Sequence, residues 1–414
     1  MRLLHLIHQY MPDKVGGTEL YTQTVARFQI AQGDEAAIFT PSAATSRFPE
    51  PDFENGVRLY RVPVGQRSAN QLFSSNFRQS QLSQAWAAVL SREQPDLVHI
   101  QHLMGLPFGL IKQLWTAQIP YLITLHDYYY FCANAQLLTN DHSQLCDGPQ
   151  LGLNCGRCAL ARAGLPPLTP LAIPLAPLFV WRNRQLRQIA RRARRLIAPT
   201  EFVRQFYLQA GFPPDKMLVI GHGIQPPDIL PPKPQTAAQP LHIVYAGGLA
   251  WQKGVHVLVT AVNQLPHDAV KLTIAGDPDA FPEYSRSLRQ LAQHPQIHLP
   301  GKLDRSQLWA LLGEADIVVV PSLWHETASL IIQEAFAAGT PVVASRIGAL
   351  PERVNDGVDG LLFPPGDDAA LQVILARLSA EPALLAKLRQ GIRPVRTVEE
   401  HLLTLTAVYQ ELLK

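Results

Sequence analysis

Short apolar runs alternate with amphipathic segments through the first half of the chain. The runs RLLHLIH, EAAIFT, DLVHIQH and PYLITLHD are bounded by polar or turn-forming residues, and helices are expected from about Glu19 to Gln32 and around LPFGLIKQLW. Short apolar runs of this kind are typical of buried strands. Their alternation with helical segments predicts βαβ units around a parallel sheet.

The same alternation begins again after residue 240. The runs LHIVYAGG, VKLTIAGD, IHLPG, ADIVVVPS and PVVAS are separated by helical segments, the first of which starts at Val255. The chain closes with the amphipathic segment TVEEHLLTLTAVYQELL. We therefore predict an α/β protein with two Rossmann-like domains that face each other across a cleft. Ligands of such sheets collect at the carboxyl ends of the strands.

The segment IQPPDILPPKPQTAAQP separates the two halves. It is rich in proline and has no hydrophobic period, which is typical of a linker. We expect an N-terminal domain over residues 1–225, a linker over 226–240, a C-terminal domain over 241–395, and a final helix over 396–414 that packs back on the N-terminal domain. A cysteine-containing segment at about residues 131–160 does not fit the alternation of strands and helices, and we interpret it as an insertion.

Composition agrees with a folded protein of two or three domains, and the net charge disfavours nucleic acid as its main partner. The chain has 414 residues with 47% hydrophobic content, enough for the cores of two or three domains. A net charge of +3 is too small to indicate nucleic acid as the main partner. The start, MRLLHLIHQYMPDK, is too short and polar for a signal sequence, and there is no uninterrupted apolar run of about 18 residues. We expect a cytoplasmic protein, with peripheral contact to the inner face of the plasma membrane left open.

That contact is suggested by the segment over residues 181–195, which follows a proline-rich apolar stretch. It contains seven arginines that could lie on an anionic lipid surface. The alternative is an ordinary solvated helix face that packs through Leu186, Ile189 and Leu196. Both interpretations stay open at this point. The arginines are Arg182, Arg184, Arg187, Arg191, Arg192, Arg194 and Arg195.

All four cysteines fall within one short window: Cys132, Cys146, Cys155 and Cys158. The last two form the C-x-x-C of CGRC. In a reducing compartment, such clustering is typical of a structural zinc site with four thiolates. A disulfide, a redox-active pair and thiols that merely pack together are the alternatives.

Two glycine turns could bind a phosphate. QYMPDKVGGTELY places Gly16 and Gly17 before the first helix, and YAGGLAWQKGVHVL places Gly248 and Lys253 at the equivalent turn of the second half. Glycines allow backbone amides to approach an anion, and a lysine there can reach a diphosphate. Many βα turns have glycines and surface lysines without such a role. There is no G-x-G-x-x-G or P-loop motif, which disfavours NAD-binding and P-loop functions.

A histidine and two glutamates add candidate chemistry. His126 closes the strand YLITLHD and is expected at a carboxyl strand end, where a histidine is structural about as often as functional. In SLWHETASLIIQEAFAAGT, Glu326 and Glu334 are eight residues apart. On one helix their side chains would lie about 12 Å apart along the axis, too far to share a proton or a metal.

The preceding strand ADIVVVPS changes the interpretation of this pair. Glu326 is then expected in the loop before the helix and Glu334 within the helix. The unbonded amides of Ser329 and Leu330 lie between them and form an anion site. An elongated ligand with a central phosphate, such as a nucleotide sugar, could contact all three. Two solvated acids on a buried helix remain the simpler alternative.

With these motifs in place, the sequence resembles the retaining, nucleotide-sugar-dependent glycosyltransferases of the GT-B type, family 4. The matching segments include MPDKVGGTELYTQTVA, LITLHDYYYFC, RRARRLIAPTEFVRQFYLQAGF, AGGLAWQKGVHVLV, VPSLWHETASLIIQEAFAAGTPVVASRIGALPE and DGVDGLLFPPGD. The E-x7-E pair with its GTPVVAS continuation is the most specific. The block HDYYYFC…LCDGP…NCGRC looks like a branch of the family with a cysteine-rich insertion.

The resemblance implies a role for each motif. Glu326 would orient the donor sugar and stabilise its developing positive charge, Glu334 would bind the ribose, and His126 would contact the transferred sugar. Lys253, the amides of Ser329 and Leu330, and Gly17 would neutralise the leaving diphosphate. Gly16 and Gly248 would belong to the donor-binding turns. The N-terminal domain would hold the acceptor, a glycan or lipid-linked hydroxyl, and the C-terminal domain the donor. No catalytic metal is expected, because fixed amides and a lysine replace it.

Two departures and two alternatives qualify this expectation. Many members have an arginine where this chain has Gly248, and Arg346 is a candidate substitute; His222 replaces the usual asparagine of another turn. A nucleotide-sugar 2-epimerase of the same fold is one alternative, although the insertion and the arginine segment in the acceptor half disfavour it. A non-catalytic sugar-nucleotide-binding protein is the other.

Overall fold

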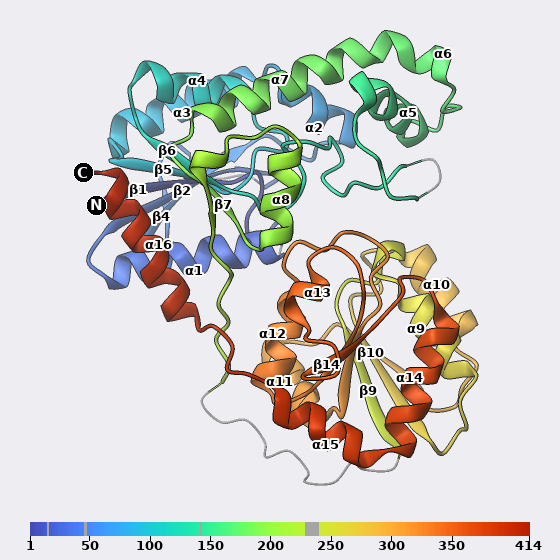
Figure 1. Cartoon of the computed structure of the whole chain (residues 1–414). Helices are drawn as coiled ribbons and strands as arrows, with labels where there is room; N and C mark the ends of the chain where they lie inside the picture. The colour runs from blue at the N-terminus through green and yellow to red at the C-terminus, as the bar shows by residue number, and fades with distance from the viewer. Residues whose placement is uncertain (15, 45–47, 141–142, 228–239) are drawn as a thin grey trace. The chain divides into compact units, whose positions relative to one another are not determined.

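The computed structural model describes residues 1–14, 16–44, 48–140, 143–227 and 240–414. These residues form two compact units, unit 1 with Met1–Ile220 and Leu402–Lys414, and unit 2 with Gly221–His401. Each unit is an α/β structure by itself (Figure 1). Most of the predicted linker, residues 228–239, lies outside the described residues.

Unit 1 is built on an eight-stranded sheet in the order β3-β4-β2-β1-β5-β6-β7-β8. All neighbours are parallel except β3 and β4, an antiparallel pair at one edge. The strands are β1 (Arg2–Leu6), β2 (Glu35–Ser42), β3 (Asp52–Glu54), β4 (Val57–Pro63), β5 (Leu97–Ile100), β6 (Tyr121–Thr124), β7 (Leu196–Ala198) and β8 (Met217–Val219).

Helices cover both faces of this sheet, as expected for strands that are apolar throughout. In Figure 1, α3, α4 and α7 lie over one face of the sheet and α1 over the other. The helices are α1 (Gly17–Ala31), α2 (Ala69–Ser75), α3 (Ser80–Glu93), α4 (Phe108–Thr116), α5 (Leu153–Arg162), α6 (Thr169–Ala172), α7 (Ala176–Arg192), α8 (Glu201–Gln209) and α16 (Val398–Leu412), with the short turns η1 (Gln150–Gly152), η2 (Ile173–Leu175) and η3 (Pro214–Lys216).

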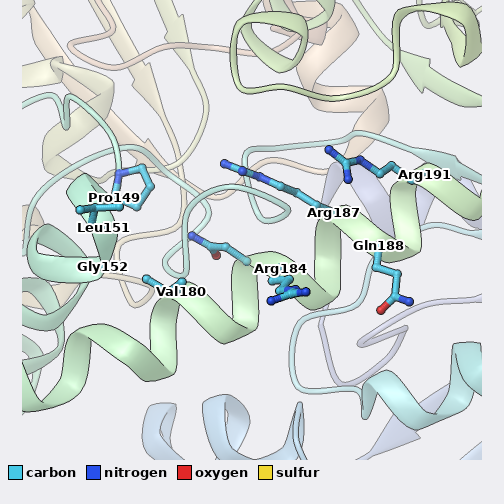
Figure 2. Close-up of a pocket in the computed structure, with 9 residues that line it drawn as sticks. Pro149, Leu151, Gly152, Val180, Arg184, Arg187, Gln188 and Arg191 are labelled. Carbon is cyan, nitrogen blue, oxygen red and sulfur yellow. The ribbon is translucent and has the colours of Figure 1, made fainter.

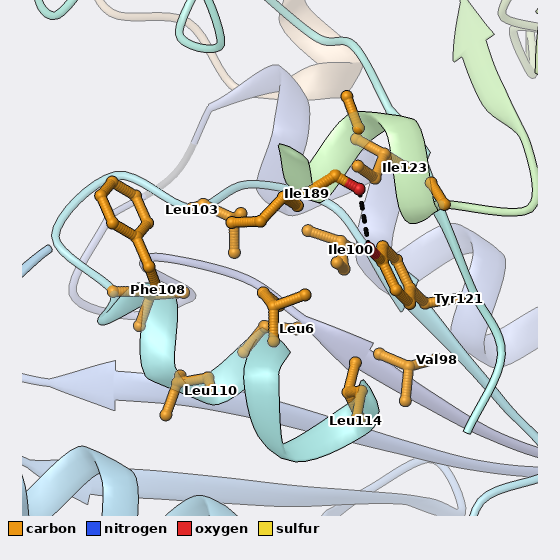
Figure 3. Packing of buried hydrophobic residues seen from close by; sticks show 14 of the residues in the cluster. Leu6, Val98, Ile100, Leu103, Phe108, Leu110, Leu114, Tyr121, Ile123 and Ile189 are labelled. Carbon is orange, nitrogen blue, oxygen red and sulfur yellow. Dashed lines mark hydrogen bonds between the residues drawn. The ribbon is translucent and has the colours of Figure 1, made fainter. Parts of the chain in front are cut away.

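The main core of unit 1 lies between the sheet and the helices α3, α4 and α7. Figure 3 shows Leu6 and Ile100 of the strands packed with Leu110 of α4. The hydroxyl of Tyr121 donates a 2.7 Å hydrogen bond to the carbonyl of Ile189, which ties β6 to α7. This bond satisfies a buried polar group inside an otherwise apolar core.

The end of the chain belongs to unit 1. Tyr409 of α16 is buried, and its hydroxyl shares a 2.7 Å hydrogen bond with His99 of β5. Arg195 pairs with Glu411 at 2.5 Å. The last helix is therefore anchored to the first unit by a buried hydrogen bond and a surface ion pair.

Unit 2 has a six-stranded, all-parallel sheet in the order β11-β10-β9-β12-β13-β14. The strands are β9 (Leu241–Ala246), β10 (Val270–Ala275), β11 (Ile297–Gly301), β12 (Ile317–Val320), β13 (Val342–Ser345) and β14 (Gly360–Phe363). The helical elements are η4 (Trp251–Lys253), α9 (Val255–Asn263), α10 (Pro282–Leu291), α11 (Arg305–Glu314), α12 (Leu330–Ala337), α13 (Leu350–Arg353), α14 (Asp368–Ala380) and α15 (Pro382–Gly391).

The structure corrects the expectation that one helix contains all seven arginines. Helix α7 ends at Arg192, so Arg194 and Arg195 follow it, and Leu196 belongs to β7. Arg182 is fully buried and donates a 2.8 Å hydrogen bond to the carbonyl of Tyr129. The seven arginines therefore do not form a single exposed face.

Within the described ranges, no single helix has the length and apolarity needed to cross a bilayer. The bent pair α14 and α15 passes that test only when the two helices are taken together.

Candidate functional site

The strand order of unit 2 places two loops side by side. Strand β9 has β10 on one side and β12 on the other, so connections leave this point in opposite directions. Loops at the carboxyl ends of such neighbouring strands form the ligand site of open α/β sheets. Here the amide of Leu323, after β12, donates a 2.8 Å hydrogen bond to the carbonyl of Gln252, after β9.

Gly254 makes this close approach possible. Its φ is +68°, and a Cβ at this position would lie 1.9 Å from the carbonyl oxygen of Pro321. A side chain is excluded both by the left-handed backbone conformation and by the lack of space beside the Pro321 carbonyl. The glycine turn recognised in the sequence therefore serves here to bring the two loops together.

Glu326 is the centre of the resulting cluster. Three donors converge on its Oε1: Lys253 Nζ at 2.8 Å, Ser322 Oγ at 2.7 Å and Trp324 Nε1 at 2.9 Å. Lys253 also lies 5.1 Å from the centre of the Trp324 ring. The side chain of Glu326 is only 7% exposed. Because all three bonds go to one oxygen, Oε2 remains the oxygen that can accept bonds from a ligand.

The charge state of Glu326 follows from these contacts. Burial raises the pKa of its carboxyl group, but the positive charge and hydrogen bond of Lys253 and the hydrogen bonds of Ser322 and Trp324 together lower the pKa below 4.5. Glu326 is therefore an ionised carboxylate at neutral pH, held in place by its neighbours.

The backbone of this loop is fixed as well. A Cβ on Gly348 would lie 2.7 Å from the amide nitrogen of Glu326, and the amide of Ala349 donates a 3.0 Å hydrogen bond to the Glu326 carbonyl. The position of the carboxylate is thus set by side-chain and backbone contacts from separate loops.

Glu334 lies within α12, whereas Glu326 lies in the loop before it, as the preceding apolar strand predicted. Arg305 Nη1 donates a 2.6 Å hydrogen bond to Glu334 Oε1. Ser329 occupies the position before the helix with φ +49°, and its hydroxyl makes no capping bond. The first amides of α12 have no preceding helical turn to bond to, and they lie between the two acids in the sequence.

Two other predicted donor contacts have different surroundings. The carbonyl of Gly248 accepts a 2.7 Å hydrogen bond from the hydroxyl of Tyr245, and the glycine is exposed. Arg346 pairs with Asp356 at 2.5 Å and does not share the contacts of Glu326. Arg305, which sequence reasoning missed, is the arginine that pairs with one of the two acids.

In unit 1, His126 ends a chain of hydrogen bonds. Its Nε2 donates to Gln101 Oε1 at 2.9 Å, Gln101 Nε2 donates to His5 Nδ1 at 3.1 Å, and His5 Nε2 donates to Gln29 Oε1 at 2.8 Å. The amide of Gln101 thereby fixes the orientation of the His126 ring. Any further hydrogen bond of the neutral ring must be accepted by Nδ1. Gln101 follows strand β5 directly, a position that a search for polar residues at strand ends would find.

The burial of His5 within this series of hydrogen bonds predicts that the stability of the folded protein depends on pH. Burial lowers the pKa of His5 to about 4, below its usual 6.5, against the opposing hydrogen bond to Gln29. Between pH 6.5 and 4 the unfolded chain binds a proton that folded His5 does not, so stability is present above pH 6.5 and falls as the pH approaches 4. A shift of this size corresponds to about 3 kcal/mol.

The measurement is the free energy of unfolding of the wild type and of His5→Asn between pH 7 and 4.5. The wild type should lose more stability on acidification than the variant, although the variant starts lower. Equal pH slopes for the two proteins would contradict the assignment of this loss to His5.

Gly16 and Gly17 begin helix α1 of unit 1. A Cβ on Gly16 would lie 2.7 Å from Glu19 Oε2, whereas none of the described atoms lies within 4 Å of such a position on Gly17. Glu19 is buried, and its Oε1 accepts a 3.0 Å hydrogen bond from Gln9. The carboxylate lies at the positive end of α1 and competes with an anionic ligand for that position.

The four cysteines are all partly buried and form no disulfide. Burial, with smaller contributions from the thiols of Cys132, Cys146 and Cys158 and against the opposing charge of Arg182, raises the pKa of the Cys155 thiol to about 12. The Cys155 thiol therefore interacts electrostatically with the other three. Even so, among the described residues no group of three or more His, Cys, Asp or Glu side chains is arranged to hold a metal ion.

Comparisons with known proteins place this geometry in context. The profile of Glycosyltransferase Family 4 matches residues 15–226, and that of Glycosyl transferases group 1 matches residues 228–394. The D-inositol 3-phosphate glycosyltransferase of Xylanimonas cellulosilytica is 27% identical over 406 residues, which cover 91% of this chain and 87% of that protein.

Solved structures show the same fold at low identity. Sucrose-phosphate synthase from Thermosynechococcus elongatus gives a TM-score of 0.72 at 20% identity, covering 100% of this chain and 99% of the other. Anabaena HepE in complex with UDP gives 0.68 at 18% identity, covering 99% and 100%. These likenesses confirm the predicted fold class of two Rossmann-like halves.

Proposed function

Since the chain belongs to glycosyltransferase family 4, we propose that it is a retaining transferase that moves a sugar from a nucleotide-diphosphate sugar to a hydroxyl of a glycan or lipid-linked acceptor. The observation that carries this proposal is the Glu326 carboxylate with three donors on one oxygen and the other left for a ligand. HepE, a structural neighbour, binds UDP. Polysaccharide or cell-surface glycan synthesis is the pathway class we propose.

Glu326 and Lys253 have complementary roles in this proposal. Glu326 Oε2 accepts hydrogen bonds from the donor sugar and stabilises the positive charge that develops as the glycosidic bond breaks. The ammonium group of Lys253 has three N–H bonds, one of which is used by Glu326, so two remain for the diphosphate. Their 2.8 Å contact keeps the two charges side by side, with the Glu326 carboxylate for the sugar and the Lys253 ammonium group for the diphosphate.

The remaining donor contacts are proposed along α12. The amides of Ser329 and Leu330 face a negative group at the helix N-terminus, and Glu334 accepts the ribose hydroxyls. Arg305 forms an ion pair with Glu334 and adds positive charge. With Lys253 and the helix N-terminus as counter-charges, leaving-group stabilisation needs no divalent ion, and the acceptor hydroxyl attacks on the face that the diphosphate leaves. The sugar contacts of His126 and the diphosphate contact of Gly17 belong to the same proposal.

A screen of nucleotide sugars for protection against thermal unfolding tests the donor site. A true donor binds only the folded state and therefore raises the unfolding temperature by mass action. At a hundredfold excess over Kd, the free energy of unfolding should increase by about 2.7 kcal/mol. Protection by nucleotide sugars with no turnover of any acceptor would favour the non-catalytic alternative. Protection with epimerisation of the free sugar nucleotide would favour the 2-epimerase. No protection by any nucleotide sugar would contradict the proposed function.

A structural zinc ion on the four thiolates remains a separate proposal. Its support is the C-x-x-C pair within α5 and the clustering of all four cysteines within residues 132–158 of the sequence. The described side chains do not yet form a ligand set, so binding would require the thiols to rotate and ionise. Metal analysis of reduced, freshly purified protein should give about one zinc per chain, and this should be lost in Cys155→Ser/Cys158→Ser. Metal-free wild-type protein would exclude the site.

A further inference from the structure

A basic groove runs along one side of α7 in unit 1. Arg184, Arg187 and Arg191 are spaced three and four residues apart and therefore share a side of the helix. Figure 2 shows them in succession along α7, with Pro149 and Leu151 on a neighbouring segment. The groove encloses about 560 Å³. Among the described residues, none of the three arginines has an ion-pair partner.

The charge around this groove has one sign. Residues 148–200 contain nine arginines and no Asp or Glu. Several of the other arginines are engaged within the protein: Arg182 packs 4.5 Å over the Tyr129 ring, Arg192 lies 4.2 Å over the Trp115 ring, and Arg195 pairs with Glu411. Within the part of the chain that the structure describes, Arg184, Arg187 and Arg191 have no such contact and line the groove together, so they can bind an external anion.

An apolar surface adjoins the groove. A second hollow of about 650 Å³ shares Leu151, Val180 and Arg184 with the first. Leu151 is 84% exposed and Ile173 is 57% exposed. Further large apolar side chains of the same stretch are exposed to water, namely Leu165, Leu168, Leu171, Leu178 and Trp181. Exposed apolar side chains that gather at a hollow mark an interaction site.

Close backbone packing holds this surface in place. A Cβ on Gly152 would lie 2.3 Å from the carbonyl oxygen of Ala176, and one on Gly156 would lie 2.8 Å from that of Ala172. The turn η1 and helix α5 are thereby pressed against α6 and α7. This contact holds Leu151 next to the apolar side of α7. The exposed apolar residues therefore lie on a surface whose shape is fixed by backbone packing.

We infer that this surface, residues 149–191, docks on a bilayer that contains anionic phospholipids. The lipid phosphates bind Arg184, Arg187 and Arg191, because guanidinium groups form paired hydrogen bonds with phosphate oxygens. The exposed leucines, Ile173 and Trp181 insert among the acyl chains. A soluble phosphate compound would account for the groove but would leave the exposed apolar residues unexplained. The inference does not require that the proposed sugar transfer is correct.

Sedimentation with lipid vesicles tests this docking. The wild type should bind vesicles of phosphatidylcholine mixed with phosphatidylglycerol, bind phosphatidylcholine alone far more weakly, and bind less at high salt. Arg184→Glu/Arg191→Glu should weaken partitioning at least about 30-fold, since each basic residue near an anionic surface contributes about a factor of five or more. The matched control is Arg286→Glu/Arg393→Glu, which changes two exposed arginines of unit 2 and should leave partitioning nearly unchanged.

The apolar part of the surface is tested separately. Leu168→Ser/Ile173→Ser should weaken partitioning about tenfold. The control Val358→Ser/Val373→Ser removes exposed side chains of unit 2 and should have little effect. Equal binding by all variants would overturn the inference. So would thermal protection by inorganic phosphate that requires Arg184 and Arg191 without any vesicle binding, because it would assign the groove to a soluble anion. Thermal protection by a nucleotide sugar, measured on the same variants, should be unchanged, so that failure at this surface is distinguishable from failure of the donor site.

Discussion

Glu326→Ala is expected to lower the rate of sugar transfer by about 10²–10³-fold, the loss seen when one fixed electrostatic group is removed from a reacting centre. The carboxylate is already oriented by Lys253, Ser322 and Trp324, so no reorganisation is needed when positive charge develops on the sugar. Truncation also leaves these three donors without their acceptor. A stability loss of about 1–3 kcal/mol should accompany the loss of rate.

Glu326→Gln separates the two effects. Glutamine retains an acceptor oxygen for the three donors, so most of the stability should return. It has no negative charge, so the rate should remain low. Glu283→Ala, which removes an exposed glutamate of the same unit, should change neither quantity. Transfer rates are measured with the donor identified by thermal protection. Normal transfer by Glu326→Ala would show that this residue does not have the role assigned to it.

The positions of the two acids could be predicted from the sequence because they depend on periodicity. The run ADIVVVPS is uniformly apolar and fixes a buried strand, so Glu326 had to follow it in a loop, and the next helix had to contain Glu334. The meeting of this loop with the turn at Lys253 follows from strand order. Strand order is set by packing of segments far apart in the chain, and no local pattern shows it.

The partners of the acids could not be predicted in this way. Ser322, Trp324 and Arg305 reach the carboxylates from loops or a helix start, where side-chain directions depend on tertiary contacts. The antiparallel edge pair β3 and β4 was also not anticipated, since Asp52–Glu54 is short and polar.

The burial of Arg182, in contrast, had a signal in the sequence. Phe179, Arg182, Leu186 and Ile189 follow the three- and four-residue spacing of one helix side, and all are buried. An arginine on the buried stripe needs a partner, which Tyr129 provides through its carbonyl and its ring. Arg182 therefore differs in environment from Arg184, Arg187 and Arg191, which line the groove.

Gly254→Ala is expected to lower the free energy of unfolding by about 3 kcal/mol or more and to weaken donor binding at the same time. An alanine would have to adopt φ +68° at a cost of about 1–2 kcal/mol. Its Cβ would also meet the Pro321 carbonyl at 1.9 Å, so the end of β12 must move. That movement separates Lys253 from the loop of Glu326, because the two loops contact each other at this glycine.

Gly357→Ala supplies the control for backbone strain alone. Gly357 has φ +75°, and no described atom lies within 4 Å of a Cβ placed on it. Its substitution should cost only the strain of the left-handed backbone and leave thermal protection by the nucleotide sugar intact. The difference between the two alanine variants, measured by denaturant unfolding and by donor protection, reports how far the close approach of the loops supports the site. If Gly254→Ala were no less stable than Gly357→Ala and bound the donor normally, the contact between the β9 and β12 loops would not be what holds Lys253 beside Glu326.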